Sequence, residues 1–317
     1  IKMKMFEKQI KLANPRGFCA GVDRAIDIVN RALEIHGAPV YVKHEVVHNK
    51  FVVEDLKRRG AIFIEEINEI PDGSLVIFSA HGVSDKVEAE TKERNLNFYD
   101  ATCPLVTKVH MEVVRHARAN RDIILIGHEG HPEVEGTMGR HIDKKNSNIY
   151  LVQDNKEALS IKIINQDNLA IVTQTTLSVD DTKSIINILK NRFPKIKIPK
   201  KDDICYATQN RQDAVKQLAL ESDYMIVVGS INSSNSNRLK ELAEKCGCKS
   251  VLIDEFDDLD LSQLDGCKNI SITAGASAPE ERVQEIAQAL EKYIGAPIIE
   301  DGKDEENIFF KLPPSLR

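Results

Sequence analysis

The sequence predicts an α/β protein of three similar small domains, each a parallel sheet flanked by helices and related to the others by a pseudo-threefold repeat. Two observations lead to this fold class. Short β-branched runs alternate with helical periodicity along the 317 residues, which favours parallel sheets covered by helices. Three cysteines, Cys19, Cys103 and Cys205, each end an extended run and begin a helical pattern, so one structural unit is repeated three times.

Nine strands are expected, three in each repeat. They are 38–42, 61–64 and 74–78 in the first repeat, 122–126, 148–152 and 169–172 in the second, and 224–228, 249–253 and 269–273 in the third. Helical periodicity or a turn rich in Gly, Ser and Asn follows each of them. Ligands bind at the carboxyl ends of parallel strands, so the polar residues directly after these strands are the candidates for a binding site.

Serines mark the start of three expected helices. Ser84, Ser178 and Ser277 each precede an amphipathic segment and are predicted N-caps, and Ser277 with Glu280 forms a capping-box pattern. The repeats predict domains at 1–102, 103–204 and 205–293. The remaining segment, 294–317, is too short for another unit, and we expect it to be an arm that packs back on the body.

The composition excludes several classes of protein. Apolar content of 42% and charged content of 29% are typical of a soluble globular chain, and no apolar run is long enough to predict a membrane span. The net charge is −6 without a clustered basic stretch, so no nucleic-acid partner is expected. Six cysteines in a chain of this length do not resemble a disulfide framework. They favour a reducing compartment: the cytoplasm, or an organelle stroma if a transit peptide has been removed.

Each cysteine is followed by polar residues at similar distances. One set lies 28 or 29 residues after the cysteines, and a second set lies 62 to 72 residues after them. The first set is His48, His131 and Ser233, and the second is His81, Thr175 and Ser277. Three copies of a unit, each with one thiol and two polar positions, predict that the three thiols meet at a pseudo-threefold centre.

Three separate cysteines favour an iron–sulfur cluster over zinc. Structural zinc prefers four ligands in two close pairs, and these three cysteines form no such pair. Three thiolates can hold one [4Fe–4S] cluster per chain and leave one iron open to substrate. The alternative is that they are buried structural thiols. Three further cysteines break the threefold pattern and are predicted to be structural: Cys246, Cys248 and Cys267.

Other polar residues suggest a reaction on a phosphorylated substrate. The third loop, VGSINSSNSNR, offers hydroxyls, amides and backbone N–H groups to phosphate oxygens, and His48 and His131 add donors. Glu133 follows His131 and is a candidate proton donor to an iron-bound oxygen. Thr175 can orient a substrate hydroxyl or relay a proton.

One motif points elsewhere. His44-Glu45-Val46-Val47-His48 matches the H-E-x-x-H signature of zinc hydrolases. That chemistry requires both imidazoles on one face of a helix, yet this motif follows the strand 38–42 and the next helix is expected to begin near Asn49. Zinc hydrolase therefore stands as an alternative function. A non-redox iron–sulfur hydro-lyase and a non-enzymatic iron–sulfur sensor are two others.

Long strings of this sequence resemble the 4-hydroxy-3-methylbut-2-enyl diphosphate reductase family, also called LytB. The strings run from residue 14 to about residue 279, in one order. They are NPRGFCAGVDRA, HEVVHN, FSAHGVS, DATCPLVTKVH, GHPEVEGTMG, TQTTLSVDDT, DDICYAT, GSINSSNSNRL and TAGASAP.

The resemblance implies a pseudo-threefold trefoil of three α/β domains around a central iron–sulfur cluster. It also implies a reductive dehydroxylation that yields isopentenyl and dimethylallyl diphosphate. It implies Cys19, Cys103 and Cys205 as cluster ligands, Glu133 as the proton source and Thr175 beside the substrate hydroxyl. A ferredoxin or flavodoxin is implied as the electron donor. The implied diphosphate ligands are His48, His81, His131, Ser233, Ser234, Asn235 and Ser277.

Overall fold

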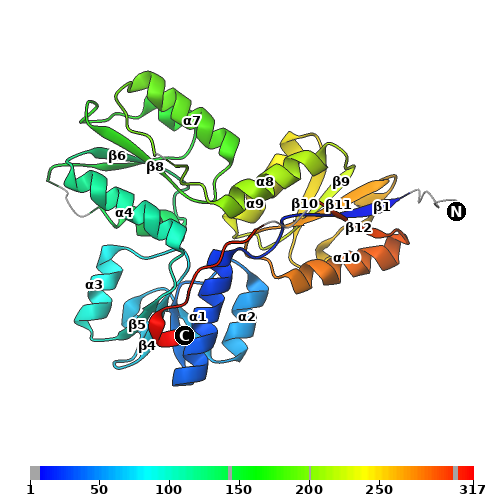
Figure 1. The fold of residues 1–317 in the computed structure, drawn as a ribbon, viewed down its shortest axis with the longest axis horizontal. Helices are drawn as coiled ribbons and strands as arrows, with labels where there is room; N and C mark the ends of the chain where they lie inside the picture. Colours follow the sequence, from blue (N-terminus) through cyan, green and yellow to red (C-terminus); the bar gives the residue numbers. More distant parts are fainter. Residues whose placement is uncertain (1–7, 142–144, 200, 303–305) are drawn as a thin grey trace. The chain divides into compact units, whose positions relative to one another are not determined.

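The computed structural model describes residues 8–141, 145–199, 201–302 and 306–317. Its strands form three separate parallel sheets, and this confirms the predicted α/β class (Figure 1). The chain divides into two compact units. One contains residues 1–19, 48–52 and 206–309, and the other contains 20–47, 53–205 and 310–317.

The four-stranded sheet has the order β3-β2-β4-β5. Its strands are β2 (Val40–Lys43), β3 (Ala61–Ile64), β4 (Leu75–Phe78) and β5 (Asn97–Asp100). The helices of this region are α1 (Ala20–His36), α2 (Lys50–Arg58), the short η1 (Ile67–Glu69) and α3 (Asp85–Glu93).

The three-stranded sheet has the order β7-β6-β8. Its strands are β6 (Asp122–Ile126), β7 (Ile149–Val152) and β8 (Leu169–Thr173). Its helices are α4 (Pro104–Arg118), α5 (Pro132–Met138), α6 (Asn155–Ser160) and α7 (Val179–Arg192). Apolar residues of α4 and α7 pack in two different core clusters of this region, so the sheet is covered on both faces.

The five-stranded sheet has the order β10-β9-β11-β1-β12. Its strands are β1 (Gln9–Ala13), β9 (Tyr224–Val228), β10 (Lys249–Ile253), β11 (Asn269–Ala274) and β12 (Ile298–Asp301). Its helices are α8 (Tyr206–Ala219), α9 (Ser234–Lys245), the short η2 (Phe256–Asp258) and η3 (Leu261–Leu264), and α10 (Glu280–Ile294). A last short helix, η4 (Pro314–Leu316), belongs to the other unit.

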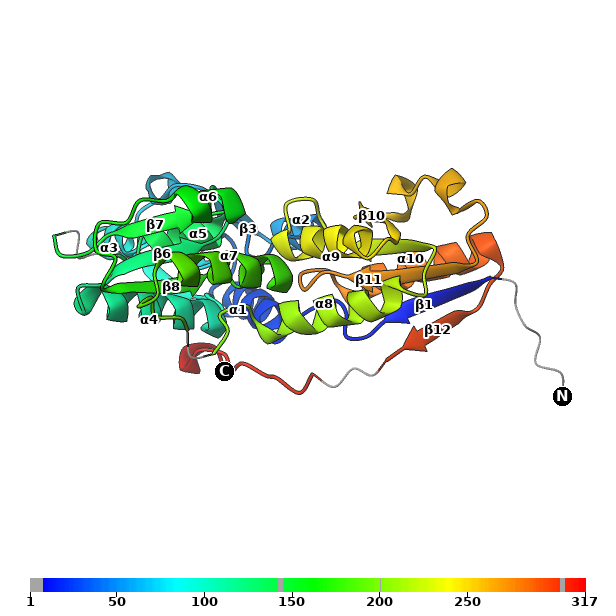
Figure 2. The same cartoon turned by 90° about the horizontal axis from the view of Figure 1, so that it is seen from above.

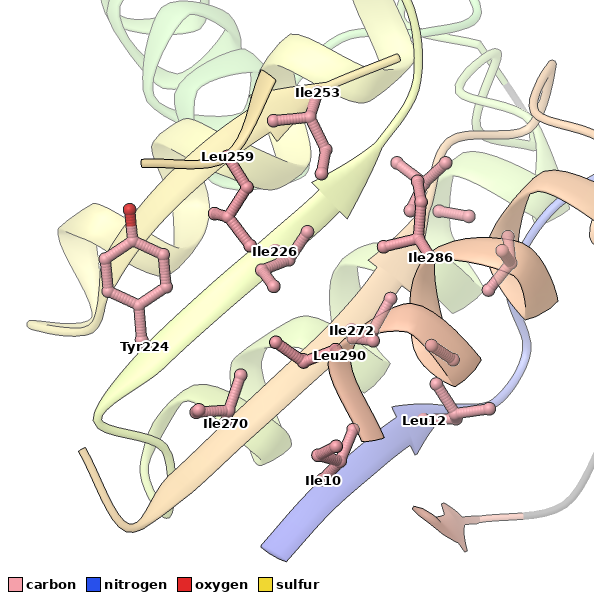
Figure 3. Close-up of a cluster of buried hydrophobic side chains, with 14 of the residues drawn as sticks. Ile10, Leu12, Tyr224, Ile226, Ile253, Leu259, Ile270, Ile272, Ile286 and Leu290 are labelled. Carbon is pink, nitrogen blue, oxygen red and sulfur yellow. The ribbon is translucent and has the colours of Figure 1, made fainter. Parts of the chain in front are cut away.

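Alternation along the strands explains why this sheet carries helices on both faces. Ile226 and Ile272 point to one face, where Ile286 and Leu290 of α10 cover them (Figure 3). Residues of opposite parity, such as Met225, lie in a second cluster with side chains of α8 and α9. Figure 2 gives a second view of the strands of this sheet and of helices α8, α9 and α10. Strands that are buried on both faces are the expected product of continuous β-branched runs.

The amino-terminal strand departs from the predicted first domain, 1–102. β1 pairs in parallel with β11 on one side and with β12 on the other, so it completes the third repeat's sheet. β5, which precedes Cys103, occupies the corresponding place in the sheet of β2–β4. β5 follows β2–β4 along the chain, whereas β1 precedes β9–β11, so the third sheet takes its corresponding strand from the amino-terminal end of the chain.

Two of the three predicted serine caps are confirmed. The Ser84 and Ser178 side chains accept hydrogen bonds from backbone N–H groups in the first turns of α3 and α7. The prediction for Ser277 is wrong, because α10 begins at Glu280 with Pro279 at its N-cap. The Ser277 hydroxyl donates instead to the His48 carbonyl, at 2.8 Å. Within the described residues, no helix has the length and apolar character that a membrane crossing requires.

Candidate active site

The three repeated cysteines share one backbone contact. The N–H of Cys19 donates to the Ala276 carbonyl at 3.2 Å, and that of Cys103 donates to the Ala80 carbonyl at 3.0 Å. The N–H of Cys205 donates to a carbonyl, that of Thr175, at 3.0 Å. Each acceptor lies two residues beyond the end of a strand: β11, β4 and β8 respectively. The threefold repetition in the sequence therefore has a structural counterpart, a backbone hydrogen bond that occurs once in each repeat.

This contact corrects the alignment of the second polar set. Thr175 is equivalent to Ala80 and Ala276, because all three accept the same hydrogen bond. His81 and Ser277 follow their acceptors by one residue, so their equivalent is Thr176. Thr175 thus lies one residue nearer the strand than the predicted alignment places it.

The repeated cysteines differ in environment from Cys248 and Cys267. Cys19, Cys103 and Cys205 are half-buried thiols, and each immediately precedes the first residue of a helix. A helix N-terminus stabilises negative charge, which suits a thiolate ligand. Cys248 and Cys267 lie in apolar clusters, and burial raises the pKa of Cys248 to about 11. The neutral thiol is therefore favoured at Cys248, as expected for a structural residue.

Glu133 is a buried carboxyl group with two partners on one residue. Its Oε1 accepts from the Thr175 N–H at 2.7 Å, and its Oε2 is 2.9 Å from the Thr175 hydroxyl. The side chain comes from the first turn of α5 and is only 2% exposed as a residue. The pKa of Glu133 is raised to about 7, mainly because the carboxyl group is buried; the two Thr175 hydrogen bonds lower it, and the nearby Asp203 adds a smaller increase. An acid with such a pKa can hold a proton and release it near neutral pH.

One predicted histidine, His131, contacts this acid, and a second, His81, contacts His131. His131 is the N-cap of α5, and its Nδ1 accepts from the Glu133 N–H at 3.1 Å. The His81 ring meets the His131 ring edge-on, with 5.9 Å between centroids. Gly82, in the loop after β4, packs closely against Gly136 of α5. A Cβ on Gly136 would lie 3.1 Å from the Gly82 carbonyl oxygen, so a larger residue there would separate the two segments. These contacts bring the loops after β4 and β6 together.

A cavity of about 280 Å³ opens beside these loops. Its walls include Ser79, whose hydroxyl is 3.3 Å from His81 Nδ1, and Gly82. Lys43 and His44 contribute basic groups to the same lining. The cavity therefore presents basic and hydroxyl groups beside the loop that carries His81.

The other compact unit holds a cluster of hydroxyl and amide groups. The Ser277 hydroxyl lies 3.4 Å from Ser233 Oγ, which in turn accepts from Ser236 Oγ at 3.0 Å. The Asn235 side-chain oxygen accepts from the Ala276 N–H at 2.8 Å, and its NH₂ group donates to the Thr208 hydroxyl at 3.1 Å. Such a cluster at the start of α9 presents several donors to an anion.

Two glycines make room for this hydroxyl cluster. A Cβ on Gly275 would lie 2.0 Å from Ser236 Oγ, and a Cβ on Gly229 would lie 2.2 Å from it. These glycines follow β11 and β9, so the first turn of α9 is pressed between the ends of two neighbouring strands. The cluster is thus a packed part of the fold, and Ser233, Asn235 and Ser277 are all buried.

The H-E-x-x-H motif does not lie on a helix. β2 ends at Lys43, and α2 begins at Lys50, so both histidines occupy the connecting segment. His44 has a left-handed backbone, with φ of 62°, and its Nδ1 lies 2.9 Å from a Glu65 oxygen. The segment therefore does not form the helix that the H-E-x-x-H signature of zinc hydrolases requires.

The structure groups the predicted site residues within each unit. Cys103, His81, His131, Glu133, Thr175 and Cys205 belong to one unit, and Cys19, His48, Ser233, Ser234, Asn235 and Ser277 belong to the other. Ser234 is the first residue of α9. Two members of the hydroxyl cluster escaped the sequence prediction, Thr208 and Ser236. The strings CYAT and SSNS contain them, but only their contacts identify them.

The fold and the site define an α/β protein with internal threefold repetition and one half-buried thiol in each repeat. Family comparison identifies the group: residues 10–291 match the LytB protein model. The chain therefore belongs to the LytB family, which confirms the resemblance read from its motifs.

Individual relatives agree with this family. A protein of Alcanivorax borkumensis described as 4-hydroxy-3-methylbut-2-enyl diphosphate reductase is 60% identical over 98% of this chain and 99% of its own length. One of Saccharophagus degradans with the same description is 61% identical over 98% of this chain and 99% of its own. Among solved structures, the E-1-hydroxy-2-methyl-but-2-enyl-4-diphosphate reductase of Plasmodium falciparum is 40% identical, with a TM-score of 0.93 over 98% of this chain and 96% of its own.

Proposed function

We propose that this chain is an oxidoreductase that removes the hydroxyl group of 4-hydroxy-3-methylbut-2-enyl diphosphate and yields isopentenyl and dimethylallyl diphosphate. This reaction is the last step of the non-mevalonate isoprenoid pathway. The C–O bond breaks, the oxygen leaves as water, and the allyl group takes a proton at one of two carbons. Each turnover consumes two electrons and two protons. The buried acid Glu133, bonded to Thr175, is the observation that supports a proton-coupled step most directly.

Cys19, Cys103 and Cys205 are the proposed ligands of one [4Fe–4S] cluster. The donor set fits this group: three half-buried thiols occur in three equivalent positions, each at the start of a helix. Three protein ligands leave one iron without a protein donor. When bound, such a cluster supplies reducing electrons and a Lewis-acidic iron at the C–O bond.

Glu133 is the proposed proton donor. With a pKa near 7 its carboxyl group is protonated in a large fraction of molecules at neutral pH. A protonated Glu133 donates to Thr175 Oγ1, whose own O–H can then donate to the departing oxygen. Burial of the pair excludes bulk water from this short relay.

The diphosphate is the proposed ligand of the polar groups. Ser233, Asn235 and Ser277 offer hydroxyl and amide donors, and the start of α9 favours negative charge. His81 and His131, whose rings contact each other, are further proposed ligands with imidazole donors. The remaining proposed diphosphate ligands are His48 and Ser234. Anchoring the diphosphate orients the reacting end, and positioning of this kind can lower a barrier by several kcal/mol.

We place the reaction in the cytoplasm, where glutathione and thioredoxin keep cysteines reduced, and assign electron delivery to a small ferredoxin or flavodoxin. Six thiols without a disulfide among them suit such a compartment.

An anaerobic preparation tests the proposal. We expect visible absorption, iron and sulfide in nearly equal amounts, and consumption of the diphosphate only when a reductant such as dithionite with a viologen mediator is present. Cys103→Ser should abolish the absorption, whereas the matched change Cys246→Ser, outside the repeat, should preserve it. A colourless wild-type protein, or turnover that needs no reductant, would contradict the proposal.

A further inference from the structure

The three helices that follow the repeated cysteines each carry a basic residue near the same place. It stands five residues after the cysteine in α1 and in α4, and six residues after it in α8. These residues are Arg24, Lys108 and Arg211. None of them belongs to the proposed proton relay or to the diphosphate ligands.

Arg211 holds the chain that leads into Cys19. Among the described residues it is the largest fully buried side chain, with no exposed surface. Its Nε and Nη2 donate to the Gly17 carbonyl at 3.0 and 2.8 Å, and Nη2 also donates to the Phe18 carbonyl at 3.2 Å. Gly17 needs its left-handed backbone, φ of 66°, to present this carbonyl. Glu306 balances the buried charge at 2.9 Å.

Arg24 makes the corresponding contact with the chain that leads into Cys103. Its Nη1 donates to the carbonyl of Thr102, the residue directly before this cysteine, at 3.1 Å. Its Nη2 lies 3.5 Å from the Asp100 carbonyl oxygen, where β5 ends. Arg24 is thus bonded to backbone on the amino-terminal side of a cysteine that lies 79 residues further along the chain.

Lys108 does the same for Cys205. Its Nζ donates to the carbonyls of Lys201 and Asp202, at 3.3 and 3.2 Å. It also pairs with the buried carboxylate of Asp203 at 3.2 Å. Asp203 in turn accepts from the Thr173 N–H at the end of β8, so this pair fastens the segment to the sheet.

We propose that Arg24, Lys108 and Arg211 are positioning residues for the three cysteines. Each lies on the helix that follows one cysteine, and each bonds to the backbone on the amino-terminal side of another. The order is cyclic. The helix after Cys19 holds the Cys103 segment, the helix after Cys103 holds the Cys205 segment, and the helix after Cys205 holds the Cys19 segment. The proposal rests on the proposed function only in treating the thiols as ligands; the contacts themselves do not depend on it.

The carboxy-terminal arm contributes to two of these contacts. Glu306 pairs with Arg211, and the Lys311 carbonyl accepts from Arg24 Nε at 3.0 Å. An arm whose role could not be read from its sequence therefore supplies acceptors that orient two of the three cations.

The test is the alkylation rate of each cysteine in metal-free protein, measured with a pulse of isotopically labelled N-ethylmaleimide and mass spectrometry of the peptides. Arg24→Gln should accelerate Cys103, Lys108→Gln should accelerate Cys205, and Arg211→Lys should accelerate Cys19. We expect each rise to be about fivefold, the effect of about one net hydrogen bond on a local opening equilibrium. The other two cysteines of each variant should keep their wild-type rates.

Arg115→Gln, on the exposed face of α4, is the matched control and should change none of the three rates. Equal acceleration of all three cysteines in every variant would show general destabilisation and overturn the proposal, as would acceleration of the cysteine on the altered helix itself. If Arg211→Lys does not fold, the Arg24 and Lys108 variants carry the test, since both side chains are only half-buried. Iron content is measured separately: an iron-free wild type with the expected alkylation pattern would contradict the proposed function and leave the positioning residues standing.

Discussion

At the scale of single residues, Glu133 has the most perturbed chemistry among the proposed site residues. A carboxyl group in water is ionised at neutral pH, and burial is what keeps a proton on this one. Thr175 contacts it through both its N–H and its hydroxyl, so the acid is held in one orientation. The neighbouring Glu135 is exposed and has no such environment.

Replacing Glu133 by Gln should lower kcat about 100-fold or more, because the amide has no proton to donate. Gln keeps the size of the side chain and can still accept from the Thr175 N–H, so substrate binding and visible absorption should persist. Single-turnover kinetics under anaerobic conditions provide the measurement, with Glu135→Gln as the matched control. Near-normal turnover in Glu133→Gln would exclude this residue as the proton donor.

The pKa of Glu133 also predicts the pH dependence. The folded value of about 7 lies above the ordinary 4.5, so the stabilisation of the protonated form is complete below pH 4.5 and is lost as the pH rises to 7. The free energy of unfolding should therefore fall by about 3 kcal/mol across this window from this group. In the same sense, kcat should decline above pH 7 as the acid loses its proton. Urea unfolding of wild type and Glu133→Gln at several pH values tests this. The same dependence of the free energy of unfolding on pH in the two proteins would contradict it.

At the scale of elements, the hydroxyl cluster depends on how closely α9 approaches two strands. Gly229 and Gly275 leave the space that Ser236 fills, and the Ser236 hydroxyl supports Ser233. The ends of β9 and β11 are therefore part of the proposed anion site even though neither glycine offers a side chain.

Gly275→Ala should raise KM and lower the free energy of unfolding by about 2 kcal/mol, because its Cβ would overlap the Ser236 hydroxyl. The double variant Gly275→Ala with Ser236→Ala should recover much of the stability, since it removes the atom in closest conflict. Thermal melts and steady-state kinetics measure both effects, with Ser236→Ala alone as the reference. An unchanged KM in Gly275→Ala would argue against an anion site at this cluster.

At the scale of the whole molecule, the carboxy-terminal arm is integrated into the fold. β12 pairs with β1, and Glu300 pairs with Arg16 at 2.7 Å. Glu306 reaches the buried guanidinium of Arg211 and keeps only 12% of its side chain exposed. The arm and the amino-terminal strand therefore stabilise the same sheet and the segment before Cys19.

Glu306→Gln should destabilise the protein by about 3 kcal/mol, because it leaves a buried cation without a counter-charge. Glu285→Gln removes an exposed ion pair with Arg282 and should cost at most about 1 kcal/mol. Urea unfolding at pH 7 distinguishes the two. Equal stabilities of the two variants would show that the Arg211 pair contributes no more than a surface contact.

Much of this protein follows from short-range information in its sequence. All nine predicted strands are present, and the Ser84 and Ser178 caps are confirmed, because strand runs and N-caps depend on neighbouring residues. The long motifs identified the LytB family before any coordinate was considered, and the family comparison confirms it. The roles of the individual site residues stay predictions.

The tertiary structure alone determined which distant segments pair, which groups form long-range hydrogen bonds and which groups are buried. A parallel sheet takes its strands from separate parts of the chain, so no local pattern predicted that β1 would join β11. The hydroxyl of Ser277 found an acceptor 229 residues away in preference to capping the next helix. Burial raised the pKa of Glu133, and buried carbonyls gave Arg211 its partners. Desolvation and long-range hydrogen bonding arise only when the chain has folded. The sequence by itself determines which residue types are present and where they stand along the chain.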